Sequence, residues 1–157
     1  MFWMKGCMDM SELQELKKIL LVGRTECGKT SLADMLTHGF TAYHKTQTIT
    51  RVGTFIDTPG EYIENPNYYR GVILNSYEAD LVIFMNEAGD EETIFPPNFA
   101  HSLNREVIGV ISKVDSGESL ETPRKNLESA GVSKIFEVSI YDASSLDALR
   151  QYIVKEA

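Results

Sequence analysis

An octapeptide from Gly23 to Thr30, GRTECGKT, constrains the fold of this chain more than any other feature. It follows the apolar run 17–23 (KKILLVG), which predicts a buried parallel strand, and helical spacing of apolar residues begins after Gly28. The pattern G-x-x-x-x-G-K-S/T between a strand and a helix predicts a loop whose backbone N–H groups surround phosphates. Lys29 adds a positive charge to that loop, and the Thr30 hydroxyl is suited to Mg²⁺.

The tetrapeptide DTPG closes a second predicted strand, 54–57, downstream of the phosphate loop. In that position the Asp57 carboxylate can hold a water molecule bound to Mg²⁺, and the Gly60 N–H can reach a γ-phosphate. The same tetrapeptide would also serve as an ordinary turn at the end of a strand. Its place behind the phosphate loop favours the nucleotide site.

The tetrapeptide SKVD, with Ser112, Lys113 and Asp115, follows the buried run 106–112 (EVIGVIS). Because parallel strands end at one edge of a sheet, we expect these residues beside the phosphate loop. A carboxylate there accepts hydrogen bonds from the N1–H and the 2-amine of guanine, whereas adenine has an acceptor at N1 and no 2-amine. The tetrapeptide therefore predicts GTP and GDP, with Mg²⁺, as cofactors in preference to ATP. On its own, it would be interpreted as a solvated loop.

Predicted strands and helices alternate along the chain, which indicates an α/β fold of three layers. We predict a mostly parallel six-stranded sheet with one antiparallel edge strand, formed by a hairpin around Gly53, and helices on both faces. The further strands are expected at 47–51, 80–85 and 134–138, and the further helices from Asn65-Pro66, from Thr122-Pro123 and after the N-cap Asp142. The irregular stretch 86–98, with its Pro96-Pro97 pair, is expected to be a contact surface.

The composition narrows the class of partner. A formal charge of -8 argues against nucleic acid, because a phosphate backbone is bound by an excess of Lys and Arg. The two cysteines are too few for a disulfide framework, which indicates a reducing compartment, and no apolar run is long enough to cross a bilayer. We therefore expect a cytoplasmic protein that binds neither nucleic acid nor a membrane.

The ordered set GRTECGKT, DTPG and SKVD, with VSI at 138–140, resembles the Ras-like, translation-factor-related GTPases of the P-loop NTPase class. Longer strings, KTQ at 45–47, IDTPGEYIENPNYYR at 56–70 and IFPPNFA at 94–100, resemble the ethanolamine and propanediol utilisation family EutP/PduV. The resemblance covers the chain from about Lys18 onward. It implies a small G domain associated with bacterial microcompartment metabolism, with a shell or cargo protein as a partner.

The resemblance also assigns roles to residues. Lys29 would contact the β- and γ-phosphates, Lys113 and Asp115 the base, and Thr30, Asp57 and Thr46 the magnesium site, with Thr48 and Thr50 competing for the place of Thr46. The residues expected to contact nucleotide are Gly23, Thr25, Glu26, Cys27, Gly28, Lys29, Thr30, Ser31, Gly60, Ser112, Lys113, Asp115, Ser139 and Ile140.

Two positions depart from the common pattern of such proteins. Glu61 stands where many have a glutamine that orients the attacking water, so we expect slow hydrolysis with Lys29 and Glu61 as the candidate catalytic residues. Ser112 stands where asparagine is commoner, which can lower nucleotide affinity without changing base preference.

We expect residues 17–157 to form the G domain and residues 1–16 to be an extension, which is a short helix, a tail or the product of a mis-assigned start codon. Two other functions stay open at this point. The chain could be a P-loop phosphotransferase that acts on a small carboxylate such as acetate, or a nucleotide-stabilised docking module for a microcompartment component.

Overall fold

The computed structural model describes residues 18–24, 28–38, 50–52, 55–57, 63, 65–91 and 95–155. Six strands form one sheet in the order β2-β3-β1-β4-β5-β6. The strands are β1 (Ile19–Gly23), β2 (Thr50–Val52), β3 (Phe55–Asp57), β4 (Leu81–Glu87), β5 (Glu106–Ser112) and β6 (Ile135–Glu137). Five of them run parallel, and β2 pairs with β3 in the antiparallel direction at one edge. The predicted α/β fold with a parallel sheet is confirmed.

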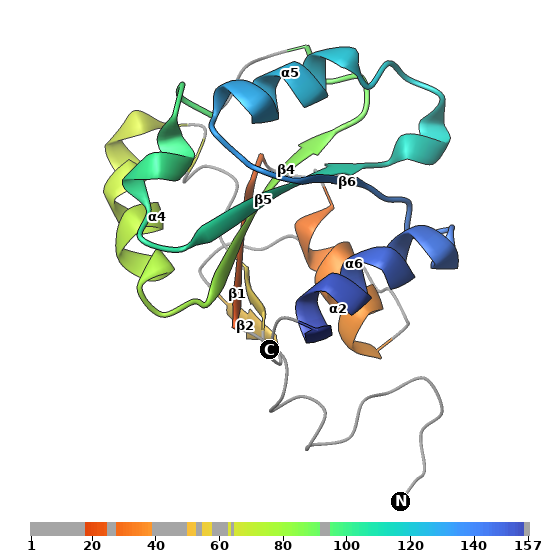
Figure 1. Ribbon diagram of the computed structural model, residues 1–157, viewed down its shortest axis with the longest axis horizontal. Coiled ribbons are helices and arrows are strands. Elements are labelled where there is room, and N and C mark those ends of the chain that lie inside the picture. The colour runs from red at the N-terminus through yellow and green to blue at the C-terminus, as the bar shows by residue number, and fades with distance from the viewer. Residues whose placement is uncertain are drawn as a thin grey trace, which may run out of the picture.

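Helices cover both faces of this sheet (Figure 1). Apolar side chains of α2 (Lys29–His38) and α6 (Ala143–Lys155) pack on one face. On the other face lie α4 (Tyr69–Ser76), α5 (Glu121–Ser129) and the 3-10 helix η2 (Phe99–Ser102). The described ranges also contain two more 3-10 helices, η1 (Pro66–Tyr68) and η3 (Val114–Ser116).

The central strands β1, β4 and β5 are apolar on both faces because both faces are covered. Every residue of β1 is buried, which explains why a continuous apolar run, and not an alternating pattern, marked this strand in the sequence. Helix α6 begins as predicted after Asp142, whose Oδ1 accepts hydrogen bonds from the N–H and the Oγ of Ser144 at 3.1 and 2.7 Å. These bonds, above all the one from the Ser144 hydroxyl, lower the pKa of the Asp142 carboxyl.

The stretch 86–98 differs from its prediction. Strand β4 continues through Glu87, and Phe95 is fully buried, with its ring stacked on Phe84 at a centroid distance of 4.4 Å. Phe99 stacks on Phe84 as well, at 5.8 Å. The described part of this segment therefore belongs largely to the core, and its exposed residues are Glu91, Pro97 and Asn98.

The predicted apolar face of the helix after Asn65 is also only partly correct. Val72 is buried and Tyr69 and Ile73 pack against the core, but Tyr77 is 51% exposed. Helix α4 ends at Ser76, so Tyr77 lies just beyond it, where the Arg105 guanidinium stands 5.9 Å from the centre of its ring.

Candidate functional site

The start of the predicted phosphate loop is anchored between β1 and α2. Strand β1 ends at Gly23 and α2 begins at Lys29, while Gly28, with φ +103°, accepts the first helical hydrogen bond from the Leu32 N–H at 2.8 Å. A positive φ of this size favours glycine, which explains why the motif has its second glycine at this position. The N-terminus of α2, with Gly28 directly before it, thus has the geometry of an anion-binding helix terminus.

The side chain of Lys29 is buried, with 6% exposure. Its Nζ donates hydrogen bonds to the backbone carbonyls of Gly23 at 3.0 Å and Arg24 at 2.9 Å. In the part of the chain that the structure describes, this ammonium contacts no carboxylate. Because these two carbonyls are neutral, they leave the positive charge of Lys29 available to attract an anion.

The base-side residues come from the ends of β5 and β6. After Ser112 the chain turns sharply, because Lys113 takes a left-handed conformation with φ 59°, and Asp115 follows in η3. The Val138 N–H donates to the Ile111 carbonyl at 2.9 Å, and the Val114 N–H donates to the Val138 carbonyl at 3.3 Å. These bonds hold the two loops side by side.

A serine fixes the carboxylate of this loop pair. The Ser139 Oγ donates to Asp115 Oδ1 at 2.8 Å and accepts from the Tyr141 N–H at 3.1 Å. Ser139 is 2% exposed, whereas Asp115 is exposed. The backbone N–H of Ser139 in turn donates to the Ser145 Oγ at 3.1 Å. The Asp115 carboxylate is therefore oriented from a buried support and stays accessible to a ligand.

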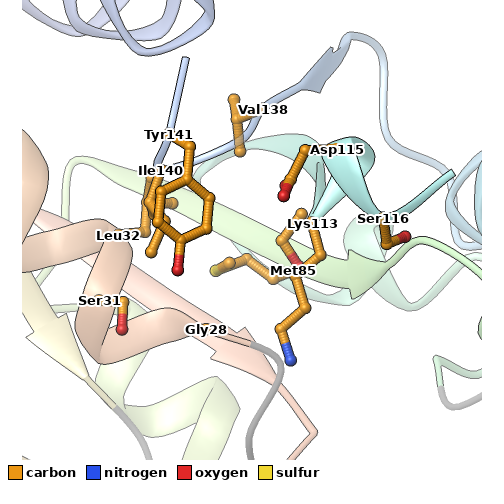
Figure 2. A pocket seen from close by; sticks show the side chains of 11 residues that line it. Gly28, Ser31, Leu32, Met85, Lys113, Asp115, Ser116, Val138, Ile140 and Tyr141 are labelled. Atoms are coloured by element: carbon orange, nitrogen blue, oxygen red, sulfur yellow. The ribbon is translucent and has the colours of Figure 1, made fainter. Parts of the chain in front are cut away.

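A pocket of about 250 Å³ lies between the phosphate loop and the base loops (Figure 2). Its apolar walls suit a flat ring, and the Asp115 carboxylate and the Lys113 side chain stand on one side with the Tyr141 ring on the other (Figure 2). The lining residues are Gly28, Ser31, Leu32, Met85, Ser112, Lys113, Asp115, Ser116, Val138, Ile140 and Tyr141.

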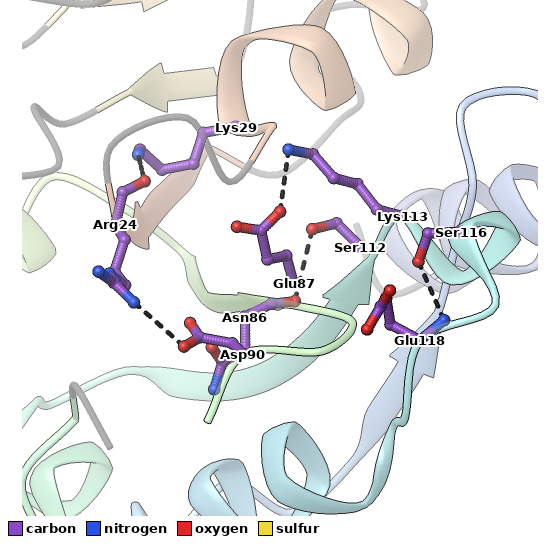
Figure 3. Close-up of polar contacts among 9 residues, drawn as sticks. All are labelled: Arg24, Lys29, Asn86, Glu87, Asp90, Ser112, Lys113, Ser116 and Glu118. Carbon is purple, nitrogen blue, oxygen red and sulfur yellow. Dashed lines mark hydrogen bonds and ion pairs between the residues drawn. The ribbon is translucent and has the colours of Figure 1, made fainter. Parts of the chain in front are cut away.

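Two ion pairs flank the pocket and the loop (Figure 3). Lys113 Nζ lies 2.9 Å from Glu87 Oε2, and Arg24 lies 3.0 Å from Asp90 Oδ1. Both acids belong to the four-residue turn 87–90, which begins at the last residue of β4. A hydrogen bond from the Asp90 N–H to the Glu87 carbonyl, at 3.1 Å, closes this turn. The Ser112 Oγ donates to the Asn86 carbonyl at 3.4 Å. Ser112 is thus tied to strand β4.

The residues predicted for magnesium are only partly described. The register of β1 with β3 pairs Leu21 with Asp57, which is the last residue of β3, and Thr30 lies buried in the first turn of α2. No group of three or more His, Cys, Asp or Glu side chains is placed to bind a metal within the described ranges. The donor set fits Mg²⁺, which needs few protein ligands and takes the remainder from phosphates and water.

The pocket brings together six of the predicted site residues: Gly28, Ser31, Ser112, Lys113, Asp115 and Ile140. Several others lie outside the described residues, namely Thr25, Glu26, Cys27, Thr46, Thr48, Gly60 and Glu61. Residues 1–16, including the proposed N-terminal helix, lie outside them too.

The sequence patterns did not single out the apolar walls or the acidic turn. The walls are Leu32, Met85, Val138 and Tyr141, and the acids are Glu87 and Asp90. Two wall residues had a local signal, because Val138 belongs to the motif VSI at 138–140 and Tyr141 directly follows that motif.

Searches against known proteins agree on a family. A family model described as "Ethanolamine utilisation - propanediol utilisation" (PduV-EutP) matches residues 16–155. The propanediol utilization protein PduV of Citrobacter freundii is 35% identical over 136 residues, which are 85% of this chain and 91% of that protein. A protein of Escherichia coli K12 named probable acetate kinase EutP is 32% identical over 142 residues, which are 88% of this chain and 89% of that protein.

The fold is also found in a solved structure. Translation elongation factor SelB from Methanococcus maripaludis, in complex with the GTP analogue GppNHp, superposes with a TM-score of 0.60 at 20% identity. The match covers 89% of this chain and 33% of the SelB chain, so this chain spans about a third of that protein. None of the helices in the described ranges is long and apolar enough to cross a membrane. From the family match and the two relatives, the chain is a member of the PduV-EutP family of ethanolamine and propanediol utilisation proteins.

Proposed function

We propose that this chain binds a guanine nucleotide with Mg²⁺ and hydrolyses GTP slowly. The observation that carries the proposal is the Asp115 carboxylate, held by the buried Ser139 hydroxyl at 2.8 Å, at the side of an apolar pocket that also reaches Gly28 of the phosphate loop. A flat base and its phosphates need these two features next to each other.

Base selection follows from the chemistry of Asp115. With one oxygen bonded to Ser139, the carboxylate still has lone pairs for the N1–H and the 2-amine of guanine. Adenine would present an acceptor at N1 and leave a carboxylate without its partners, which costs binding free energy. Leu32, Met85 and Val138 would lie against the base.

The phosphates would bind at the other end of the pocket. The N-terminus of α2 and the Lys29 ammonium supply the positive field, and Thr30 with Asp57 would hold Mg²⁺ and its water. The metal would neutralise charge that develops on the phosphate oxygens. Turnover is expected to be slow, because Glu61, and not glutamine, follows Gly60.

Calorimetry tests this proposal. GTP and GDP with Mg²⁺ should bind to the purified chain, and ATP should bind at least about tenfold more weakly, because a lost charged hydrogen bond is worth about 1.5–3 kcal/mol. The variant Asp115→Asn should prefer xanthosine nucleotides, whose 2-oxygen accepts where guanine donates, and Lys29→Ala should bind GTP poorly. Equal affinity of the wild-type chain for GTP and ATP would refute the assignment of the base pocket.

A second candidate function is phosphoryl transfer to a small carboxylate, which the name of the E. coli relative, probable acetate kinase, favours. Such a reaction uses the same phosphate loop but also needs a site for the acceptor. The stretch 86–98 could supply a lid over an acceptor site. However, Phe95 within it and Phe99 just after it are buried against Phe84, which argues against a large closure there. The test is whether acetate accelerates release of nucleoside diphosphate and yields acetyl phosphate, whereas hydrolysis yields inorganic phosphate without acetate.

A third candidate is a docking role in a microcompartment, in the cytoplasm, which rests on the resemblance of the sequence to EutP/PduV proteins. Such a role would use nucleotide for stability alone. Localisation to the microcompartment that survives Lys29→Ala would support docking without nucleotide turnover.

A further inference from the structure

The turn that follows β4 stands between the two nucleotide-binding loops and holds a cation from each. Its first residue, Glu87, pairs with Lys113 of the base loop at 2.9 Å. Its last residue, Asp90, pairs with Arg24 of the phosphate loop at 3.0 Å. We infer that Glu87 and Asp90 neutralise these two cations, which would otherwise add to the positive field at the phosphates of a bound nucleotide, and so weaken nucleotide binding and speed exchange. This inference depends on the proposed nucleotide site.

Both cations belong to segments that adjoin the predicted phosphate site. Arg24 directly follows Gly23, and its backbone carbonyl accepts a hydrogen bond from the Lys29 Nζ at 2.9 Å. Lys113 lines the same pocket as Gly28, and Figure 3 shows its side chain reaching from the base loop toward the start of α2, where Lys29 lies. Charges within a Debye length of about 8 Å act on each other at physiological ionic strength.

The backbone of this turn is held in place by hydrogen bonds to its neighbours. The Ala88 N–H donates to the Ser112 carbonyl at 2.9 Å, and the Gly89 N–H donates to the Ser119 carbonyl at 2.8 Å. Gly89 has φ +85°, and a Cβ there would lie 2.8 Å from the Glu118 side chain. The turn is therefore packed on both sides.

The two acids differ in exposure, and this sets the expected size of each effect. The Asp90 side chain is 6% exposed, whereas those of Glu87, Lys113 and Arg24 are 37%, 49% and 35% exposed. Water screens the more exposed pair. The inference therefore predicts a larger gain in phosphate affinity when the Asp90 charge is removed than when the Glu87 charge is removed.

Charge-neutral variants of similar shape test the inference in the full-length chain. Glu87→Gln should tighten GTP binding by about threefold, and Asp90→Asn, whose amide oxygen can still accept from Arg24, should tighten it by roughly five- to tenfold. The rate of GDP dissociation should fall as well, by a smaller factor. Glu91→Gln is the matched control, because Glu91 is exposed in the same segment and gives the same change in net charge.

The gain in affinity should depend on the number of phosphates, and this dependence distinguishes an effect on the positive charge near the phosphates from a structural role. The gain should be greatest for GTP, smaller for GDP and absent for guanosine, which has no phosphate. Equal changes for guanosine and GTP would overturn the inference, since they would mean that Glu87 and Asp90 only shape the base pocket. Unchanged or weaker GTP binding by both variants, with thermal midpoints like that of Glu91→Gln, would overturn it as well. Failure of the wild-type chain to bind GTP would instead refute the proposed function.

Discussion

Replacing Ser139 with alanine removes the support of the proposed base-reading carboxylate. The wild-type hydroxyl donates to Asp115 Oδ1 at 2.8 Å and accepts from the Tyr141 N–H at 3.1 Å, and the residue is 2% exposed. The alanine variant loses only an oxygen atom from a buried position, so it leaves the volume of the pocket nearly unchanged. Asp115 then has to be ordered by the ligand itself.

The expected loss of affinity follows from the value of that hydrogen bond. Hydrogen bonds to charged groups contribute about 1.5–3 kcal/mol, and the exposure of Asp115 allows water to replace part of this one. We expect a loss of about 1 kcal/mol, which weakens GTP binding about fivefold. ATP makes no bond to Asp115 in this geometry, so the ratio of GTP to ATP affinity should fall by the same factor in calorimetric titrations.

The exposed Ser133 provides a control for the substitution, because Ser133→Ala should leave both affinities unchanged. GTP affinity of Ser139→Ala within twofold of the wild-type value would refute the reasoning that Ser139 orients the carboxylate. Equal losses for GTP and ATP would also refute it, because they would point to a general disturbance of the pocket.

Three further predictions concern stability. Phe95→Ala should lower the free energy of unfolding by about 3–5 kcal/mol in urea titrations, because it empties a fully buried site in the core; a loss below 1 kcal/mol would mean that this segment is peripheral. Gly131→Ala should lower the free energy of unfolding by more than about 1 kcal/mol, because φ is +97° and the new Cβ would lie 2.8 Å from the His101 ring; an unchanged thermal midpoint would contradict this. The pKa of Asp142 is lowered in the folded state, so this carboxylate stabilises the fold above the ordinary carboxyl pKa of 3.8, and that stabilisation is lost as the pH falls through the lower, folded value. Asp142→Asn should therefore flatten the decline of unfolding free energy with pH below about pH 4. A stability curve identical to that of the wild type would refute the link.

The layer order of the fold could be predicted from the sequence because each central strand is buried on both faces. The runs at 17–23 and 106–112 are apolar without alternation, and glycine or proline punctuates the helices between the strands. The predicted strand at 80–85 ended too early. Asn86 and Glu87 are polar, yet they continue the ladder opposite Ile111 and Ser112 because backbone pairing does not depend on side-chain polarity.

Contacts between segments distant in the chain could not be predicted in the same way. The two prolines after Phe95 indicate an irregular segment, and they do so correctly, but no local pattern shows that Phe95 stacks on Phe84 of β4. The same distinction applies to the residues of the candidate site. Spacing within a motif predicted Gly28, Lys29 and the SKVD residues, whereas the walls of the pocket come from elements whose proximity only the folded sheet creates.

The lengths of neighbouring strands explain why an acidic turn stands beside the two loops of the proposed nucleotide site. In the parallel register, Gly23 at the end of β1 pairs with Met85, yet β4 continues to Glu87, opposite Ser112. Strand β4 therefore projects two residues beyond the point where the phosphate loop leaves the sheet, and its turn rises between the two loops. The overhang of polar strand residues thus places the two acids beside Lys113 and Arg24, and under the proposed function it sets how much positive charge would remain for a nucleotide.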